Sequence, residues 1–330
     1  MRPAVVLGTN LFVGGGALVY VLLRFGGPAL RVLASRPSGG LLLAFAAAAA
    51  AGIVGYAARW KILLAGLGTP RGLGRLTAYR AAGQSLSSLI PSGKLGGEPL
   101  RAYLLLRDRV PGASAIASVA VDRTLEVGAS ATFACLFAAV LFRGGVPALH
   151  GAFVTVSLAA LALALGIGVS VRRLRRGAGL VTAVAHATGL DRLALVRGQL
   201  GALGAAEDAA ARLVAQPRRI GWAFGAGVLA NVLVLVEYYL LLAAFGLPAG
   251  PLALVAAIFA TGAAHSVPVP AGVGTLEGAQ MFIFGALGHP PEVGLAVGLA
   301  VRLRELVWIL PGLLYLMVRG IRPAGFDAPG

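Results

Sequence analysis

The sequence predicts an all-α, polytopic membrane protein with an inverted repeat and two re-entrant broken-helix hairpins. Three observations predict this class. Hydrophobic residues make up 58% of the 330 residues and charged residues only 12%, which is more apolar than ordinary soluble domains. Apolar stretches of about 20 residues, long enough to cross a bilayer, recur along the chain. Two polar, glycine-containing segments, PSGKLGGEP (91–99) and PAGVGTLEG (270–278), share a pattern.

The apolar windows predict six membrane spans. The first window follows a single early arginine and is longer than the core of a signal peptide, so we expect it to be retained. The spans are predicted at residues 3–23, 40–64, 113–142, 149–171, 218–245 and 291–318. Two further apolar regions, 76–106 and 252–288, are each interrupted by one of the polar segments.

Basic residues predict which side of the membrane each connection faces, because cytoplasmic loops are rich in Lys and Arg. The segment 172–217 begins with RRLRRG and has helical periodicity with charges of both signs, so we expect cytoplasmic amphipathic helices there. The connections 246–251 and 289–292 contain neither Lys nor Arg and are expected on the opposite side. The loop after the second span is expected to be cytoplasmic, with Arg59, Lys61, Arg71, Arg75 and Arg80.

One part of the chain does not fit this orientation. The segment between the first two spans is placed outside the cytoplasm, yet it carries Arg24, Arg31 and Arg36. Two features support the orientation more strongly than these three arginines oppose it: the connections without basic residues and the central arginine-rich segment. We therefore keep the orientation and expect the first span to be its weakest part.

The two polar segments indicate an internal repeat. Aligned at an offset of 179 residues, they share the pattern PxGxxxxE, and an RxxE pair recurs on the span that follows each one. Such matches of Pro, Arg and Glu are rare by chance, because the composition is dominated by Ala and Gly. The pairs are Pro91 with Pro270, Gly93 with Gly272, Glu98 with Glu277, Arg123 with Arg302 and Glu126 with Glu305.

The repeat organises one integral membrane domain, 1–330. Each unit is expected to contain a full span, an interrupted hairpin and a second span. The loop charges make the first hairpin enter from the cytoplasm and the second from outside, an inverted topology found in many transporters. The expected parts are the first span and loop (1–39), repeat 1 (40–142), a linking span and amphipathic linker (143–218), repeat 2 (219–321) and a cytoplasmic tail (322–330).

The hairpin tips are candidate binding elements. Pro and Gly interrupt a helix and expose backbone N–H and C=O groups, which a bilayer tolerates only inside protein or beside a water-filled cavity. The N–H groups at the start of a half-helix attract anions such as phosphate. The expected tip residues are Pro91, Gly93, Gly96 and Gly97 in the first hairpin, and Pro270, Gly272 and Gly274 in the second.

Charged residues near the tips form the candidate site for a lipid headgroup. The basic side chains would contact phosphate, and the acidic ones would pair with them or bind a cationic headgroup or a proton. The alternative is a set of structural salt bridges that hold the hairpins against their neighbours, because intramembrane charges usually pair. The candidate residues are Lys94, Glu98, Arg101, Arg123, Glu126, Glu277, Arg302 and Glu305.

Other polar residues are weaker candidates for the binding site. We expect Asp122 to neutralise the adjacent Arg123. A polar stripe on the span 218–245 either lines the same cavity or, for its two tyrosines, lies at the membrane interface, which is the simpler interpretation of the tyrosines. The stripe consists of Asn231, Glu237, Tyr238 and Tyr239. His265 is a possible proton relay, although a structural or incidental role is favoured.

Several classes of function find no support. The sequence has no metal-ligand spacing, no phosphate-cradling or dinucleotide motif and no nucleophile elbow, so we expect no metal, no cofactor and no catalytic residue. The formal net charge of +16 lies mostly between spans, which argues against nucleic acid as a partner. Cys135 is the only cysteine, so a disulfide framework is excluded.

The segments PSGKLGGEPLRAYLL, VDRTLE and VPVPAGVGTLEGAQMFIFGALG resemble the lysylphosphatidylglycerol synthase transmembrane family of flippase-like proteins. The resemblance covers roughly 40–320 and implies a lipid-handling, multi-pass protein of the inner (cytoplasmic) membrane, with membrane lipids as partners. It departs from the family's second motif at Ala271, where a glycine is common. Because the sequence ends at Gly330, we expect no synthase domain and no synthase activity.

Three functions remain open from the sequence. The favoured one is a lipid transporter that moves a phospholipid or another polar lipid between leaflets. A second is a membrane-embedded enzyme or accessory subunit of lipid or glycolipid synthesis, such as hopanoid synthesis, with lipid-biosynthesis enzymes as partners. A third is a small-solute transporter that shares the architecture.

Overall fold

The computed structural model describes residues 3–35, 37–89, 96–144, 150–177, 199–267 and 272–319, with the single residues 179, 188 and 269. Within these ranges all regular structure is helical and no strand occurs. The all-α class is therefore confirmed. Helices that are long and apolar enough to cross a membrane make the chain a multi-pass membrane protein.

Five helices of the described ranges meet the length and hydropathy expected of a span. They are α1 (Pro3–Ser35), α2 (Gly39–Gly66), α5 (Gly112–Arg143), α6 (His150–Arg175) and α10 (Pro217–Ala244). The helix α13 (Pro291–Val318) has 28 residues, as many as α2 and α10. It is not among the five helices, and it carries three charged residues in its middle, Arg302, Arg304 and Glu305. Five of the six predicted spans therefore coincide with long helices, and only the first differs clearly.

The helix that contains the first predicted span is longer than expected. The helix α1 continues to Ser35, past residue 23 where the span was expected to end, and its part Leu18–Ser35 is long and apolar enough to cross a membrane. Arg24 and Arg31 consequently lie inside a helix and not in a loop. Their side chains can extend along the helix to reach the interface, as arginines near helix ends do in membranes.

The order of helices recurs along the chain. In each half, a long helix is followed by two short helices and a second long helix. The short helices are α3 (Leu73–Leu89) and α4 (Glu98–Arg107) in the first half, and α11 (Pro251–Ser266) and α12 (Thr275–Ala286) in the second. The first residues of the matched helices lie 178, 178, 177 and 179 residues apart, close to the offset of the sequence repeat.

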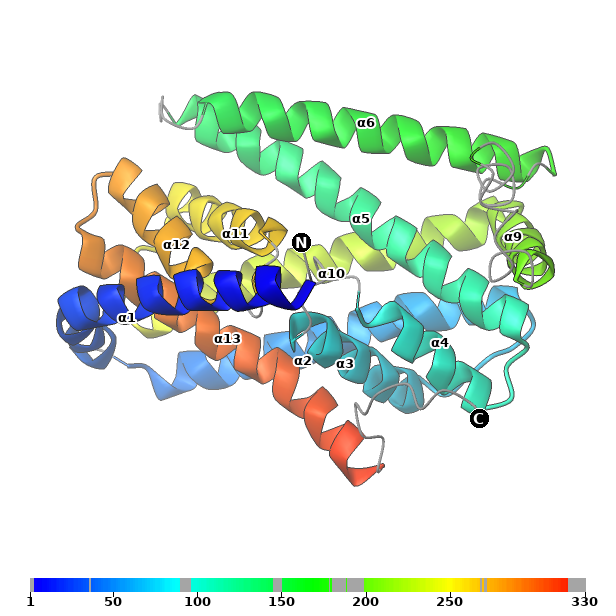
Figure 1. Cartoon of the computed structure of the whole chain (residues 1–330), viewed down its shortest axis with the longest axis horizontal. Helices are drawn as coiled ribbons and strands as arrows, with labels where there is room; N and C mark the ends of the chain where they lie inside the picture. Colours follow the sequence, from blue (N-terminus) through cyan, green and yellow to red (C-terminus); the bar gives the residue numbers. More distant parts are fainter. Residues whose placement is uncertain are drawn as a thin grey trace.

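The matched long helices α2 and α10 run in opposite directions (Figure 1). At one end, the backbone N–H of Ser38 before α2 donates to the carbonyl of Ala244 at the end of α10, over 2.8 Å. At the other end, the Gln216 side chain before α10 donates to the carbonyl of Gly66 over 3.1 Å. Figure 1 shows α5 and α13 in opposite directions too. The inversion of the repeat across a bilayer remains a prediction.

The two pairs of short helices lie toward opposite ends of the bundle (Figure 1). The four short helices have 10 to 17 residues, whereas a helix needs about 20 residues to cross a membrane. Where α3 and α4 meet, Gly97 lies so close to the backbone of Gly83 that a Cβ on Gly97 would be 2.0 Å from the Gly83 carbonyl oxygen. The re-entrant character of both hairpins stays a prediction.

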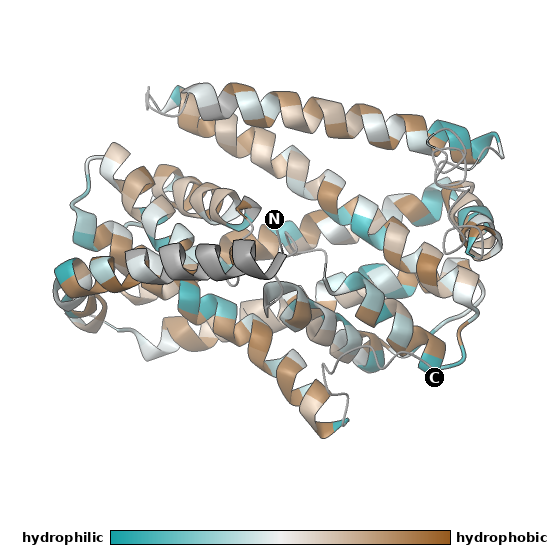
Figure 2. Cartoon of the chain, viewed as in Figure 1, coloured by the Kyte–Doolittle hydropathy of each residue, from teal (hydrophilic) through white to brown (hydrophobic). Residues whose placement is uncertain are grey.

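The basic residues of the described connections gather at one end of the bundle, which we call the basic end. Here α2 ends, α10 begins, and α9 (Leu200–Val214) packs against the start of α5 and the end of α6. Figure 2 shows hydrophilic residues where α6 and α9 meet. Arg143, at the far end of α5, is an exception. The basic end is the predicted cytoplasmic side.

Part of the predicted basic loop is helical and buried instead. Arg59 lies in α2 and is fully buried, and Arg80 lies in α3 and is 5% exposed. Both were expected in a loop because they flank an apolar window. In the structure these two arginines turn toward the interior of the bundle, where carboxylates neutralise them.

The unique cysteine allows a test of the orientation. In a Cys135→Ala background, a cysteine at Gly68, next to the end of α2, should react with a membrane-impermeant maleimide only from the cytoplasmic side. A cysteine at Gly250, before α11, should react only from the opposite side. Labelling of intact cells and of inside-out vesicles measures this. Reaction of both positions from the same side would contradict the opposed orientation of the two hairpins.

Candidate functional site

Each half of the chain contains a cluster of charged residues within the helical bundle. Such charges are costly in a membrane and persist when they pair with one another or face a water-filled cavity. The first-half cluster comprises Arg59, Arg80, Glu98, Arg101, Asp122, Arg123 and Glu126. The second-half cluster comprises Glu237, His265, Glu277, Arg302, Arg304 and Glu305.

A triad of one arginine and two glutamates occurs in both clusters. Arg302 contacts Glu277 through Nε and Oε1 at 2.7 Å and Glu305 through Nη1 and Oε2 at 2.9 Å. The equivalent Arg123 contacts Glu98 at 3.3 Å and Glu126 at 3.0 Å. The sequence repeat is therefore a repeat of contacts. Each triad joins the second helix of a hairpin to the long helix that follows.

The second triad also binds the tip of its hairpin. The backbone N–H of Gly274 donates to Glu277 Oε2 over 3.0 Å, and Arg302 Nη2 donates to the Gly272 carbonyl over 2.7 Å. The φ angles of Gly274 and Gly272 are positive, 78° and 59°, and residues other than glycine rarely adopt such values. The carboxylate of Glu277 is thus itself the anion at the start of α12, the position that the sequence suggested for an external anion.

Asp122 is the centre of the first-half cluster. It accepts hydrogen bonds from Arg59 Nε at 2.7 Å, Arg80 Nη1 at 2.9 Å and Arg101 Nη2 at 2.6 Å. The expectation that Asp122 neutralises Arg123 is therefore wrong. Adjacent residues of a helix point to different faces, so Asp122 faces α2, α3 and α4 while Arg123 turns toward the two glutamates.

Aromatic rings support the buried arginines. The guanidinium of Arg101 lies 4.1 Å from the Trp60 ring centroid, and those of Arg59 and Arg80 lie 5.2 and 5.0 Å from the Tyr56 centroid. Such contacts stabilise a cation that has lost water. Counted together, the four arginines and three carboxylates of the first-half cluster leave an excess of one positive charge.

This larger arginine cluster has no counterpart in the second half. At the offset of the repeat, the partners of Arg59, Arg80, Arg101 and Asp122 are Tyr238, Phe259, Gln280 and Val301. Instead, the second half contains a different buried pair, in which Glu237 accepts from Arg304 Nε at 2.8 Å and from Trp308 Nε1 at 3.0 Å. The two halves share the triad and differ around it.

His265 is bonded to the second triad and is not incidental. Its Nε2 lies 2.7 Å from Glu305 Oε1, and its Nδ1 lies 2.7 Å from the carbonyl oxygen of Thr261. At the offset of the repeat its counterpart is Leu86, so the repeat itself does not predict this contact.

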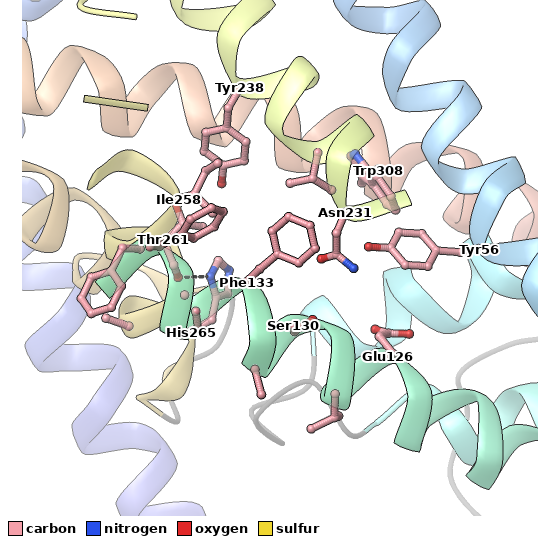
Figure 3. Close-up of a pocket in the computed structure, with 18 of the residues that line it drawn as sticks. Tyr56, Glu126, Ser130, Phe133, Asn231, Tyr238, Ile258, Thr261, His265 and Trp308 are labelled. Atoms are coloured by element: carbon pink, nitrogen blue, oxygen red, sulfur yellow. Dashed lines mark hydrogen bonds between the residues drawn. The ribbon is translucent and has the colours of Figure 1, made fainter. Parts of the chain in front are cut away.

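A cavity of about 600 Å³ lies between the two halves and is partly open (Figure 3). Charged and polar side chains of both clusters line one part of it, and apolar side chains of α5, α6 and α11 line another. Figure 3 shows Tyr56 and Glu126 at one side, His265 and Thr261 at the other, and Phe133 between them. The charged lining residues are Arg80, Arg123, Glu126, Arg304 and Glu305, with His265.

The structure places the predicted site residues in several parts of the bundle. Arg123, Glu126 and Glu305 line the cavity. A neighbouring cleft of about 10 Å³, the size of a single water, is lined by Glu98, Gly97 and Arg101. The second hairpin tip contains Glu277, Gly272 and Gly274, where Glu277 contacts Gly274 and Arg302 contacts Gly272. Gly96 lies just before α4. The remaining predicted residues, Lys94, Pro91, Gly93 and Pro270, fall outside the described residues.

The sequence did not single out several cavity residues. Tyr56, Ser130, Phe133 and Trp308 lie on faces of long helices that look uniformly apolar in the sequence. Of the predicted polar stripe, Asn231 lines the cavity, and Tyr238 is 2% exposed instead of lying at an interface. The sequence offered one signal for Arg59 and Arg80: both fall within predicted apolar regions, 40–64 and 76–106, and not in the connection between them. Within the described ranges, no group of His, Cys, Asp or Glu could hold a metal ion.

Comparisons with known proteins agree with this architecture. A family model described as "Lysylphosphatidylglycerol synthase TM region" matches residues 5–312. A "UPF0104 membrane protein" of Methanothermobacter thermautotrophicus strain Delta H is 25% identical over 261 residues, which cover 75% of this chain and 76% of that protein. No solved structure matches the chain.

Replacing Asp122 tests the centre of the first-half cluster. Asp122→Asn should lower the free energy of unfolding by about 3–5 kcal/mol, because three buried arginines lose their shared carboxylate. Arg75→Gln is the control, since the ion pair of Arg75 with Asp108 is exposed and such pairs contribute about 0–1 kcal/mol. Denaturant titration in detergent micelles measures both. Equal effects would contradict the central role of Asp122.

Exchanging the charges of Glu277 and Arg302 tests the second tip. The single variants Glu277→Arg and Arg302→Glu should each destabilise the protein, and the double variant should recover only part of the loss. A full recovery is not expected, because an arginine at 277 cannot accept from the Gly274 N–H and a glutamate at 302 cannot donate to the Gly272 carbonyl. A double-mutant cycle of thermal stability measures the coupling. Complete recovery would show that only the ion pair matters.

Proposed function

Because the chain belongs to the lysylphosphatidylglycerol synthase transmembrane family, we propose that it is a lipid transporter that moves a phospholipid or another polar lipid between the leaflets of the cytoplasmic membrane. One observation carries the proposal. The cavity between the two halves has charged groups on one wall and apolar groups on another, as an amphiphile requires. Its volume of about 600 Å³ lies within the usual range of ligand pockets, about 300–1,000 Å³.

The apolar wall of the cavity suits the glycerol and upper acyl region of a lipid. It includes Phe133 and Phe137 of α5, Val156 and Leu163 of α6, and Ile258 of α11. No residue in the apolar window of α6 is fully buried within the protein, so this helix is expected to face lipid on its outer side. A lipid whose headgroup enters the cavity can therefore leave its tails in the bilayer.

Arg123 is the residue that we assign to the phosphate of the headgroup. Its contact with Glu98 is 3.3 Å long and has no hydrogen-bond geometry, and neither Arg123 Nε nor Glu98 Oε2 has a hydrogen-bond partner among the described residues. Arg302, by contrast, makes two contacts with Glu277 and one with the Gly272 carbonyl. A phosphate can thus compete for Arg123 at lower cost, and the excess positive charge around it favours an anion.

The duplicated triads suit a transporter that opens alternately to the two sides. Each triad holds one hairpin against its long helix, and the hairpins lie toward opposite ends of the bundle. Transporters with inverted repeats alternate by moving one repeat against the other around a central site. We propose that a headgroup bound at Arg123 loosens the first hairpin while the second remains closed.

Reconstitution into liposomes tests the function directly. Vesicles with the wild-type protein should exchange a fluorescent anionic phospholipid between leaflets, as measured by dithionite quenching of the label. Arg123→Gln should slow the exchange by about tenfold or more, since a charge-assisted contact is worth about 1.5–3 kcal/mol. Arg212→Gln, on the exposed face of α9, is the matched control and should exchange like the wild type.

Two outcomes would contradict the proposal. If wild-type vesicles exchange no lipid of a panel with anionic, zwitterionic and glycosylated headgroups, the protein is not a lipid transporter. If mass spectrometry of the extracted lipids shows a new chemical species after incubation, the protein is a membrane-embedded enzyme instead.

A further inference from the structure

The hydrogen bonds of His265 require a proton in the second-half cluster. The carbonyl oxygen of Thr261 can only accept, so the ring nitrogen Nδ1, at 2.7 Å, must donate its N–H. A neutral imidazole has one N–H group and therefore leaves Nε2 as an acceptor. An ionised Glu305 is also an acceptor only, and two acceptors do not form a hydrogen bond at the observed 2.7 Å.

One additional proton between Nε2 and Glu305 Oε1 resolves this conflict. The pair is then either an imidazolium beside a carboxylate or a neutral imidazole beside a carboxylic acid. Both forms contain one proton more than the neutral imidazole and the carboxylate together. The hydrogen bonding therefore fixes the number of protons on the pair without deciding which atom carries the last one.

The proton also sets the charge of the second-half cluster. Without it, Arg302 and Arg304 face the carboxylates of Glu237, Glu277 and Glu305, which gives this cluster one excess negative charge. With the proton on the His265–Glu305 pair, the cluster is neutral. The first-half cluster, which lines the same cavity, has the opposite excess of one positive charge.

The groups around the pair come from several helices. On α13, Arg302 Nη1 contacts the second oxygen of Glu305 at 2.9 Å, and on α12, Glu277 holds the other side of Arg302. Across the cavity, α5 presents Arg123 and Glu126, and the cavity is also lined by Arg80 of α3, Tyr56 of α2 and Arg304 of α13. The lining of the cavity from α10 is uncharged, with Asn231, Val234 and Tyr238, and that from α6 is apolar.

The pair can exchange its proton with water. His265 and Glu305 both line the cavity, and each side chain is 16% exposed. An anion bound at Arg123 would share this cavity and would favour the protonated, more positive state of the pair. By reciprocity, a protonated pair would favour binding of the anion.

From these observations we infer that His265 and Glu305 form a proton-binding site and that the transporter moves one proton together with an anionic lipid headgroup. The coupling rests on the proposed lipid transport, whereas the proton site rests on the contacts of His265 alone. The proton moves as H⁺ between water and the pair, and no other bond changes.

The proton site is testable without transport. Infrared difference spectra of the purified protein in lipid nanodiscs, taken between acidic and alkaline pH, should contain a carboxyl or imidazolium band from the pair. The band should be absent in Glu305→Gln and in His265→Leu, which introduces the residue found at the matched position of the first half, Leu86. His289→Leu is the control, because His289 packs on Phe284 and is not part of the cavity lining.

The coupling is tested in proteoliposomes with an imposed pH gradient. If one proton accompanies one headgroup, a gradient of about one pH unit should shift the leaflet ratio of a fluorescent anionic phospholipid by up to about tenfold. The wild type and His289→Leu should show this shift. His265→Leu should lose it, and so should His265→Gln, in which an amide donates to Glu305 without a titratable proton and the local packing is kept.

The outcomes separate the two proposals. If the wild type exchanges lipid between leaflets and the pH gradient does not change the leaflet ratio, the coupling is wrong but the lipid transport is not. A pH-dependent band that persists in both His265→Leu and Glu305→Gln overturns the proton site. Absence of any exchange by the wild type overturns the transport itself, and the coupling with it.

Discussion

Charges inside a membrane protein must be neutralised, and the rest of this structure depends on how that is done. A Glu–Arg–Glu triad occurs in each half and ties a pair of short helices to a long one. Short helices that enter a bilayer without crossing it leave polar helix ends within it, and the re-entrant position is predicted for these four. The triad supplies partners for those groups, as Glu277 and Arg302 do for the backbone of Gly274 and Gly272.

The paired charges also shape the cavity. Arg123 and Glu126 reach it from α5 and Glu305 reaches it from α13, so the groups that secure the hairpins also line the space between the halves. The structural and the functional readings of the RxxE pairs are therefore compatible. An ion pair that faces a cavity can hold a hairpin in one state and bind a headgroup in another, provided that the competing contact is of similar strength.

The differences between the halves are as informative as the repeat. The first half adds Arg59, Arg80, Arg101 and Asp122 and carries an excess positive charge, whereas the second half adds a histidine beside Glu305. One side of the cavity is thus suited to an anion and the other to a proton. This difference between the halves is the basis of the coupling that we propose.

The sequence by itself determined the helical class, the long helices after the first, the offset of 179 residues and the glutamates and arginines of both triads. It could do so because membrane-length apolar windows and rare charged residues are local signals that composition makes conspicuous. Only the tertiary structure decided the partners. Which face of a helix Asp122 presents, how deeply Arg59 and Arg80 are buried, and that His265 meets Glu305 depend on helices that are distant in the chain. Those contacts follow from how the helices pack, which no local pattern specifies.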